Sequence, residues 1–300
     1  MTDEADFRPF ACVAIVGVGL MGGSLGQALR ARGLARRVLG VDREAGTLEK
    51  AVALGAIDAG SLDIAEAMRE ADGVVVAVPV GILPSLLETM APHVRPDALI
   101  TDLGSTKARI VETGTRLFGP RFVGGHPMAG SEESGITAAH ADLFTGAAWA
   151  VVRPEPFDFA SDLHAARLAA LVSALGGRPI ALDAERHDRL VALVSHLPHV
   201  LSFAFARTVG ADEAAEQARQ MAGGSFRDMI RVSAADPSLW RDIFLDNRAA
   251  LLESLAAFQT QLYALQQALE TADSAHLLST LTSLCAPSPS NKKAAKRSLE

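Results

Sequence analysis

A histidine that follows two glycines is the residue best suited to proton transfer in this sequence. His126 comes directly after Gly124-Gly125, at the end of a short apolar run. Imidazole accepts a proton near neutral pH, so His126 can take the proton of a hydroxyl or amine whose carbon loses a hydride. The two glycines are expected to let the backbone approach the ring of a redox cofactor. The alternative is a histidine that caps a strand and contacts only backbone.

Two hydroxyl groups precede a predicted helix earlier in the chain. Ser105 and Thr106 follow the predicted strand that ends at Asp102. Serine and threonine are common N-cap residues, so capping of the helix is the simplest interpretation. A hydroxyl one strand away from His126 can also hydrogen-bond the reacting oxygen and orient the imidazole.

A glycine turn joins the first predicted strand to a helix. Gly17, Gly19 and Gly22 form a Gly-x-Gly-x-x-Gly pattern directly after the apolar run that ends at Val16. Gly17 allows the tight turn, Gly19 lets the backbone approach a pyrophosphate, and Gly22 lets the helix pack close to the strand. The pyrophosphate would bind the free N–H groups at the helix N-terminus. The pattern therefore predicts dinucleotide binding.

An acidic residue follows at the spacing that ribose recognition requires. Asp42 lies 20 residues after Gly22, at the end of the second predicted strand. A carboxylate there accepts from the ribose hydroxyls and repels the extra phosphate of NADP, so it favours NAD. The neighbouring Arg43 can instead accommodate that phosphate, which would allow NADP. The predicted cofactor-binding residues are Gly17, Gly19, Leu20, Met21, Gly22, Asp42, Arg43 and Pro79.

Two further clusters lie in the second half of the chain. His196 and His199 are three residues apart on one predicted helix, but no third ligand completes a metal site, and we expect no metal. Arg227 and Arg231 are four apart on one helix face. Such a pair suits a substrate carboxylate, because a guanidinium binds it through two parallel hydrogen bonds. A solvated helix face is the alternative.

The apolar pattern indicates which elements position these residues. Short β-branched runs alternate with helical stretches up to residue 183, which predicts an α/β fold with a doubly wound, Rossmann-type parallel sheet. Ligands of such sheets bind outside the carboxyl ends of the strands, where His126, Ser105 and Asp42 are predicted to lie. The predicted strands are 12–16, 37–41, 73–78, 98–102, 121–124, 148–152 and 179–182.

The second half of the chain is predicted to be entirely helical. From residue 184 to 284 apolar residues recur at helical spacing, with Asp183 and Asp236 as predicted N-caps. The run 239–269 is apolar on more than one face, so we expect a homodimer formed through this part. The predicted domains are 9–183 for nucleotide binding, 184–286 for substrate binding and dimerisation, and a disordered tail at 287–300.

Composition restricts the class of protein. The chain has 300 residues, of which 49% are hydrophobic and 21% charged, as expected of a globular protein with a sizeable core. A net charge of −7 argues against nucleic acid as the main partner. The acidic N-terminus, together with apolar runs that charges or turns interrupt, predicts a cytoplasmic protein without a membrane span. Cys12 and Cys285 are too few for a disulfide framework.

Five segments together resemble the prephenate/arogenate dehydrogenase family. They occur in the family's order and extend over nearly the whole chain up to residue 284. The His-Pro-x-Ala-Gly and Phe-x-Asp-x-x-Arg patterns are specific, whereas the glycine turn is not. The segments are 17–22, 102–107, 124–132, 195–199 and 226–242. The resemblance implies oxidative decarboxylation of prephenate, arogenate or both, with hydride transfer to NAD or NADP in tyrosine biosynthesis, and a helical dimerisation domain.

The same resemblance implies a role for each matching residue. His126 would accept the proton of the ring C4 hydroxyl as hydride leaves C4, and Ser105 would hydrogen-bond that hydroxyl and help to align His126. Arg231 would hold the ring carboxylate that leaves as carbon dioxide. His199 would contact the side-chain end of the substrate. The remaining substrate-binding residues would be Arg227 and Trp240, from this subunit or its partner, and Ser131.

One departure from the family concerns regulation. Some members carry a C-terminal regulatory domain, for which the sequence after Leu284 leaves no room, so inhibition by tyrosine would have to act at the active site. Prephenate and arogenate differ by a keto group against an ammonium group. Glu132 and Glu133 can favour the ammonium or face solvent, so the preference stays open.

Two other functions fit parts of the sequence. A β-hydroxyacid dehydrogenase shares the Gly-Leu-Met-Gly opening. Resemblance to that family would imply a lysine in the second domain, but this sequence has no lysine between Lys107 and Lys292. A non-catalytic NAD-binding sensor would need neither a base such as His126 nor a carboxylate clamp such as Arg231. Reduction of NAD in the presence of prephenate distinguishes an enzyme from a sensor.

Overall fold

Short apolar runs form a sheet whose central strands are buried on both faces. All residues of β1 (Val13–Val16) and β4 (Gly73–Val76) are buried, as parallel strands between two helical layers require. The computed structural model describes residues 8–130 and 133–285. Contacts divide the chain into two units, Met1–Ala250 and Leu251–Glu300. The sheet lies in the first unit.

The sheet has eight described strands in the order β3-β2-β1-β4-β5-β6-β7-β8. Neighbouring strands from β3 to β6 are parallel, and the order changes direction between β1 and β4, which creates a crevice at their carboxyl ends. The predicted doubly wound α/β fold is therefore confirmed. The other strands are β2 (Val38–Val41), β3 (Ala59–Ser61), β5 (Leu99–Asp102), β6 (Phe122–Pro127), β7 (Ala148–Arg153) and β8 (Arg178–Asp183).

Strand β7 has a direction that periodicity does not reveal. It runs antiparallel to β6 and parallel to β8. An antiparallel pair needs no crossover helix, and the described residues between β6 and β7 contain only the short 3-10 helix η3 (Ile136–Ala138). The edge strand β3 is also absent from the predicted set, because its three residues are too few to show a period.

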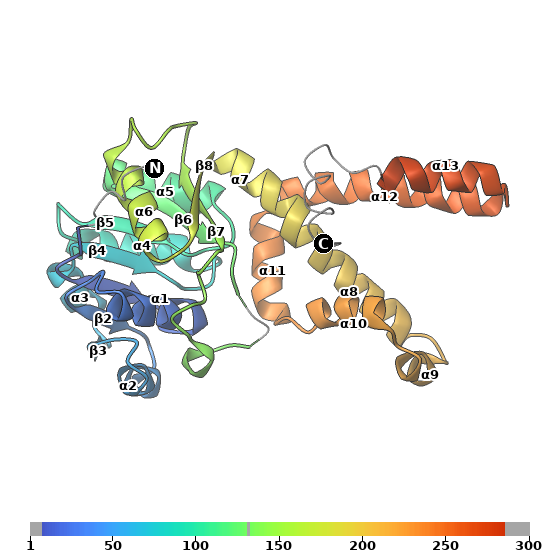
Figure 1. Cartoon of the computed structure of the whole chain (residues 1–300). Helices are drawn as coiled ribbons and strands as arrows, with labels where there is room; N and C mark the ends of the chain where they lie inside the picture. The colour runs from blue at the N-terminus through green and yellow to red at the C-terminus, as the bar shows by residue number, and fades with distance from the viewer. Residues whose placement is uncertain (1–7, 131–132, 286–300) are drawn as a thin grey trace, which may run out of the picture. The chain divides into compact units, whose positions relative to one another are not determined.

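Helices cover both faces of this sheet (Figure 1). One core cluster joins the sheet to α1, α2 and α6, and another joins it to α3, α4, α5 and the later helix α11. The helices of the sheet region are α1 (Leu20–Ala31), α2 (Ala45–Ala53), α3 (Ile64–Glu70), α4 (Leu83–Met90), α5 (Ala108–Phe118) and α6 (Leu163–Ala174).

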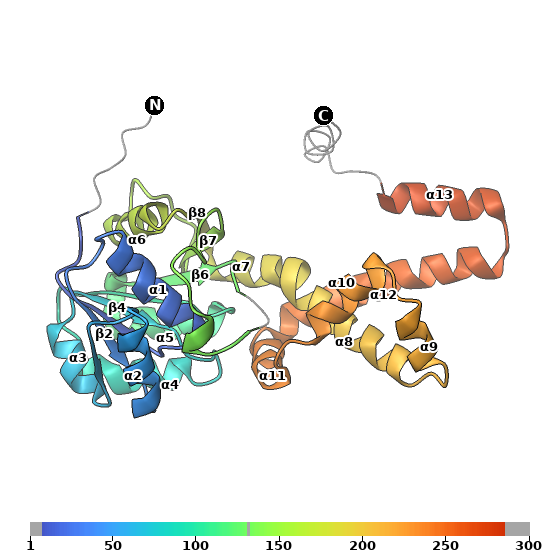
Figure 2. The same ribbon diagram turned by 60° about the horizontal axis from the view of Figure 1, so that its bottom comes forward.

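After β8 the described chain is helical, as predicted. Asp183 caps α7 by accepting from the Arg186 N–H at 2.8 Å, and Asp236 caps α11 by accepting from the Ser238 N–H at 2.8 Å. The elements are α7 (Ala184–Val191), the π-helix η4 (Ala192–His196), α8 (Leu197–Gly210), α9 (Ala215–Gln220), α10 (Gly224–Ser233), α11 (Pro237–Asp246), α12 (Arg248–Glu270) and α13 (Ser274–Cys285). Figure 2 shows α7 and α8 leading away from the sheet.

The apolar run 239–269 is not one helix. It is divided at Asn247 into α11 and α12, and Asn247 is itself buried at 5% exposure. The Asn247 side chain bonds to residues of α7 and η4, so a non-local contact ends α11 at a position that hydrophobic periodicity does not mark.

Residues 184–210 form an uninterrupted helical stretch that is polar in α7 and mostly apolar after it. By length and composition alone this 27-residue stretch meets the criterion for a membrane span, because it contains a window of 18 residues with a mean hydropathy of 1.4, of which 22% is buried. Buried helices of soluble proteins meet the same criterion. This stretch carries the buried polar side chains His187, Asp188 and His196, which lipid would not accommodate without partners.

The second unit is described by α13 and the greater part of α12. Its described residues include many exposed large apolar side chains, which would favour a protein partner over water. These are Leu252, Leu262, Tyr263, Leu269, Leu278 and Leu281. The predicted tail at 287–300 lies outside the described residues.

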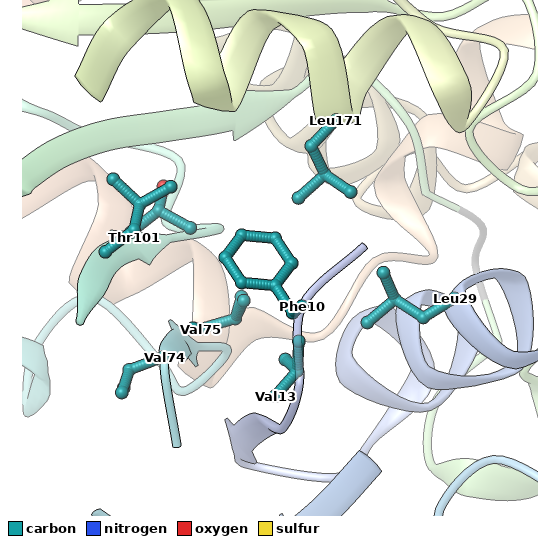
Figure 3. Close-up of a pocket in the computed structure, with 9 residues that line it drawn as sticks. Phe10, Val13, Leu29, Val74, Val75, Thr101 and Leu171 are labelled. Carbon is teal, nitrogen blue, oxygen red and sulfur yellow. The ribbon is translucent and has the colours of Figure 1, made fainter. Parts of the chain in front are cut away.

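A small cavity lies within the core of the sheet region (Figure 3). It has a volume of about 10 Å³ and is lined mainly by apolar residues of the strands β1, β4 and β5, the helices α1 and α6, and Phe10. A space of this size and polarity is at the lower limit for one water molecule. The cavity is a packing defect on the α1 and α6 side of the sheet, and it is not the ligand site.

Candidate active site

The turn between β1 and α1 has the close contacts that its glycines predict. Gly17 has φ +91°, and a Cβ there would lie 2.5 Å from the Ala77 carbonyl oxygen. A Cβ at Gly22 would lie 2.0 Å from the Gly17 oxygen, so α1 packs directly on the turn. A Cβ added at Gly19 would meet no other part of the protein within 4 Å, and no side chain caps α1. This open helix N-terminus fits a pyrophosphate.

Asp42 is held in place by backbone N–H groups at the end of β2. Its Oδ2 accepts from Val18 N at 3.1 Å and its Oδ1 from Glu44 N at 3.2 Å. The carboxylate is half-buried beside the glycine turn, with lone pairs left for ribose hydroxyls. The neighbouring Arg43 is 91% exposed, and its guanidinium lies 3.8 Å from Glu44. Leu20 and Met21 open α1, and Pro79 is exposed after β4.

A buried ion pair fixes the two segments that carry the predicted catalytic residues. Asp102, at the end of β5, pairs with Lys107, and both side chains have 0% exposure. The Asp102 carboxylate accepts from Gly104 N at 2.9 Å and from Gly125 N at 3.1 Å. One carboxylate therefore positions the residue before Ser105 and the residue before His126.

The capping interpretation of Ser105 and Thr106 is wrong. Helix α5 is capped by Asp188 of α7, which accepts from Lys107 N at 2.8 Å and from Ala108 N at 2.9 Å. The Thr106 hydroxyl donates to Asp246 of α11 at 2.5 Å. Ser105 is half-buried, and no hydrogen bond of its hydroxyl to a described residue is found. A ligand can therefore use that hydroxyl.

His126 lies within β6, which extends through Pro127 rather than ending at residue 124. The side chain is 8% exposed, and its Nδ1 lies 2.8 Å from Nε2 of His187. The His187 Nδ1 in turn lies 2.8 Å from Oδ1 of Asp188. His126 therefore contacts more than backbone, contrary to the capping alternative.

The glycines before His126 have a different role from the one expected. A Cβ at Gly125 would lie 2.5 Å from the Asp102 carbonyl oxygen and 3.2 Å from the Trp149 indole nitrogen, and at Gly124 it would lie 2.8 Å from Val111. Protein atoms already fill these spaces. The glycines therefore serve close packing of β6 against its neighbours rather than approach of a cofactor ring.

Burial keeps the histidines of this cluster neutral. It lowers the pKa of His126 well below its usual value, and the positive charge of Lys107, or of His187 when protonated, acts in the same direction. Burial also lowers the pKa of His187, although its hydrogen bond to Asp188 opposes this. The pKa of Asp188 is below its usual value despite burial, because His187 and two backbone N–H groups donate to it. His126 is thus an unprotonated base at neutral pH.

Helices η4, α8 and α11 bring a second group of aromatic and polar side chains together. Asn247 Nδ2 donates to the Asp188 carbonyl oxygen at 2.8 Å and lies 3.1 Å from His196 Nδ1. His199 stacks on Trp240 with ring centroids 3.5 Å apart, and its Nδ1 donates to the Ser195 carbonyl oxygen at 2.8 Å. His196 is 1% exposed, and its Nε2 is buried without a described partner.

The two arginines of α10 are exposed, whereas His126, His187 and His196 are buried. Arg227 and Arg231 are both exposed, and the Arg227 guanidinium donates to the Ala222 carbonyl oxygen at 2.9 Å. Helix α10 packs against α8, where the Ser202 hydroxyl donates to the Met229 carbonyl oxygen. The described hydrogen bonds do not bring either arginine into the network around His126. Ser131 lies outside the described residues.

Sequence patterns miss several residues of this network. His187, Asp188 and Asn247 occur in no local motif, and each meets its partner across at least 59 positions of the chain. The one signal available is the position of His187 and Asp188 on the same face of the amphipathic helix α7 as the apolar Ala184 and Val191. Among the described residues, no group of three or more suits a metal ion.

The fold and the glycine turn define a dinucleotide-binding protein of the Rossmann class. A model of the prephenate dehydrogenase nucleotide-binding domain matches residues 25–172, and one of the prephenate dehydrogenase dimerization domain matches 183–283. A cyclohexadienyl dehydrogenase of Zymomonas mobilis is 35% identical, over 90% of this chain and 92% of that protein. A prephenate dehydrogenase of Lactococcus lactis is 33% identical, over 83% of this chain and 69% of that protein. The chain belongs to the prephenate dehydrogenase family.

Solved structures agree with this assignment. Aquifex aeolicus prephenate dehydrogenase, in complex with hydroxyphenyl propionate and NAD+, has a TM-score of 0.86 and 30% identity, covering 98% of this chain and 99% of that one. Synechocystis arogenate dehydrogenase has a TM-score of 0.77 and 29% identity, covering 95% and 99%. A Mycobacterium tuberculosis 3-hydroxyisobutyrate dehydrogenase has a TM-score of 0.53, 17% identity and coverage of 83% and 88%, a likeness of fold alone.

Proposed function

We propose that the chain is an NAD-dependent dehydrogenase that oxidises and decarboxylates prephenate, arogenate or both in tyrosine biosynthesis. The observation that carries the proposal is a buried, neutral His126 on β6, next to the strand β5 that leads to Ser105, in a chain similar over nearly its full length to dehydrogenases of these substrates. Other nucleotide-binding functions do not require a base at this position.

The glycine turn and Asp42 would hold NAD. Bound NAD supplies the acceptor for the hydride that leaves the substrate. Gly17, Gly19 and Gly22 leave the N-terminus of α1 open to a pyrophosphate, and the fixed Asp42 carboxylate would accept from ribose hydroxyls. The same carboxylate would repel a 2′-phosphate, so we infer a preference for NAD over NADP.

His126 would hold the proton that moves during the reaction. As the C4–H electron pair leaves the ring carbon, His126 takes the proton of the C4 hydroxyl and a C4=O bond forms. When the bond between C1 and its carboxylate breaks, that electron pair enters the ring and the oxygen takes the proton back as a phenol. The residue must therefore both accept and return one proton, and Ser105 would orient the oxygen beside it.

Cationic and aromatic groups of the helical part would hold the two carboxylate-bearing ends of the substrate. Arg231 would hold the ring carboxylate until it leaves as carbon dioxide, and His199, stacked on Trp240, would contact the side-chain end. Arg227 and Ser131 complete the proposed set. Exposure of α10 supports a site completed by the partner subunit, with Arg227 as its contribution.

The helical part would also form a homodimer. The match of residues 183–283 to a dimerization domain supports this, as do the exposed leucines of α12 and α13. We propose 9–183 as the nucleotide-binding domain and 184–286 as the substrate and dimerisation domain. We also propose that the protein is soluble and cytoplasmic, like a biosynthetic enzyme.

Initial rates with both substrates and both cofactors test the proposed function. We expect reduced-cofactor absorbance to appear with prephenate or arogenate, and faster with NAD than with NADP. Binding of NAD without turnover of either substrate would support the sensor function instead. Faster turnover with NADP would overturn the role given to Asp42.

A further inference from the structure

The hydrogen bonds around His126 continue to a second histidine and a carboxylate. Nδ1 of His126 meets Nε2 of His187 at 2.8 Å, and Nδ1 of His187 meets Oδ1 of Asp188 at 2.8 Å. The exposed fractions of the three residues are 8%, 1% and 7%. Water therefore does not compete for these two contacts, and each of them must join a donor to an acceptor.

The carboxylate at the end of this row of hydrogen bonds determines which ring nitrogen of each histidine carries the proton. Asp188 accepts from two backbone N–H groups, those of Lys107 and Ala108, so it is held as an ionised acceptor. Its neighbour His187 must then donate through Nδ1–H. A neutral His187 has no second proton, so its Nε2 is an acceptor. That acceptor requires a proton on Nδ1 of His126.

The consequence for His126 concerns the ring nitrogen that can act as a base. With Nδ1 protonated, the neutral imidazole has an unprotonated Nε2, which makes no described hydrogen bond to protein. We propose that His187 and Asp188 are positioning residues that fix His126 as the tautomer with Nε2 free, so that this atom exchanges the proton of the substrate hydroxyl. The inference deepens the proposed function and rests on it for the role of Nε2.

The same arrangement supports the protonated state of the base. When Nε2 of His126 takes a proton, the imidazolium keeps its hydrogen bond to His187, and the ionised Asp188 lies one ring further on. The other cation among the neighbours is Lys107, which is paired with Asp102, and His196 is neutral. Charge on His126 is therefore stabilised through His187 rather than by direct contact with a carboxylate.

Two variants of His187 separate positioning from packing. His187→Phe keeps a ring but cannot accept from His126, whereas the side-chain oxygen of His187→Gln can accept that proton. We expect kcat to fall about 100-fold in the Phe variant and less than about tenfold in the Gln variant, the scale of lost general-base catalysis. The KM for substrate should change less than about threefold in both. His164→Gln, a histidine on α6 away from the network, is the matched control.

Nitrogen-15 NMR of the histidines in the ligand-free protein reports the tautomer directly. We expect His126 to carry its proton on Nδ1 at neutral pH in the wild type and in His187→Gln, and to lose that preference in His187→Phe. A proton on Nε2 of His126 in the wild type would overturn the proposal, and so would equal losses of kcat in the Phe and Gln variants. The wild-type spectrum tests the tautomer of His126 even when the Phe variant does not fold. It also needs no turnover, so a failure of the proposed function is recognised separately, by the rate assay.

Discussion

His126 combines burial, neutrality and an orienting partner in one side chain. A histidine with these properties can receive a proton without first losing one to water. The local pattern of two glycines and a histidine marked it as a candidate base, with a strand-capping histidine as the alternative, and the family resemblance favoured the base. The partner His187 could not be selected in the same way, since it lies 61 positions away and belongs to no motif.

Removing the imidazole should abolish turnover without affecting the cofactor. His126→Ala is expected to lose kcat by a factor of about 100 or more, the usual contribution of a general base, while NAD affinity stays within about twofold. Stopped-flow rates and calorimetric titration with NAD measure the two effects. A near-normal rate in this variant would remove the proposed base.

Arg231 tests the proposed carboxylate clamp at the same scale. Arg231→Ala should raise the KM for substrate about tenfold to 100-fold, because a hydrogen-bonded charge pair contributes about 1.5–3 kcal/mol, and Arg231→Lys should restore the affinity only in part. The control is Arg219→Ala, an exposed arginine on α9 that pairs with Glu216. Unchanged apparent affinity in Arg231→Ala would contradict the clamp.

At the scale of elements, buried polar contacts join the sheet to the helices around the site. Asp188 of α7 caps α5, Asp246 of α11 accepts from Thr106, and Asp102 holds the segments before Ser105 and His126. The order of the strands and helices in the sheet region follows from hydrophobic periodicity, except for the three-residue strand β3. These cross-connections do not, because each depends on which elements meet in space. The division of the apolar run at Asn247 has the same cause.

Removing one partner of the buried pair of Asp102 and Lys107 should destabilise the fold strongly. Lys107→Met leaves a carboxylate with 0% exposure and no cation, which is expected to lower the free energy of unfolding by about 3–5 kcal/mol. Denaturant titration measures this change. The double variant Asp102→Asn/Lys107→Met removes both charges and should be less destabilised than the single one. A loss below about 1 kcal/mol for Lys107→Met would show that the pair is not structurally important.

At the scale of the whole molecule, the buried histidines make stability depend on pH. Burial lowers the pKa of His196 from 6.5 to about 4, and it lowers the pKa values of His126, His187 and His199. The unfolded chain binds protons at these residues below pH 6.5 while the folded chain does not, so the free energy of unfolding should fall between about pH 6.5 and 4.

A variant of His196 isolates its share of this effect. His196→Asn keeps an acceptor for Asn247 but does not titrate, and its free energy of unfolding should vary less steeply over that range, by up to about 1.4 kcal/mol per pH unit. Denaturant titrations of both proteins at several pH values measure the slopes. Equal slopes for the variant and the wild type would contradict a neutral, buried His196.

Exposed leucines of the second unit are expected to be covered in a dimer. Light scattering should give twice the 31.4 kDa chain mass for the wild type, and Leu262→Asp should shift it toward the monomer, because a buried charge opposes association. The matched control is Leu163→Asp on α6, which is 84% exposed in the nucleotide-binding part. A monomeric wild type, or dissociation by the control alone, would contradict dimerisation through the helices.

Conversion of a cyclohexadienol to a phenol with NAD releases two products, carbon dioxide and reduced NAD, in a fixed ratio. Carbon dioxide and reduced NAD should be measured together after addition of prephenate, or of arogenate, to the purified protein. We expect one carbon dioxide for each NAD reduced, with both products lost in His126→Ala. Formation of neither product with either substrate, although NAD binds, would contradict the proposed function.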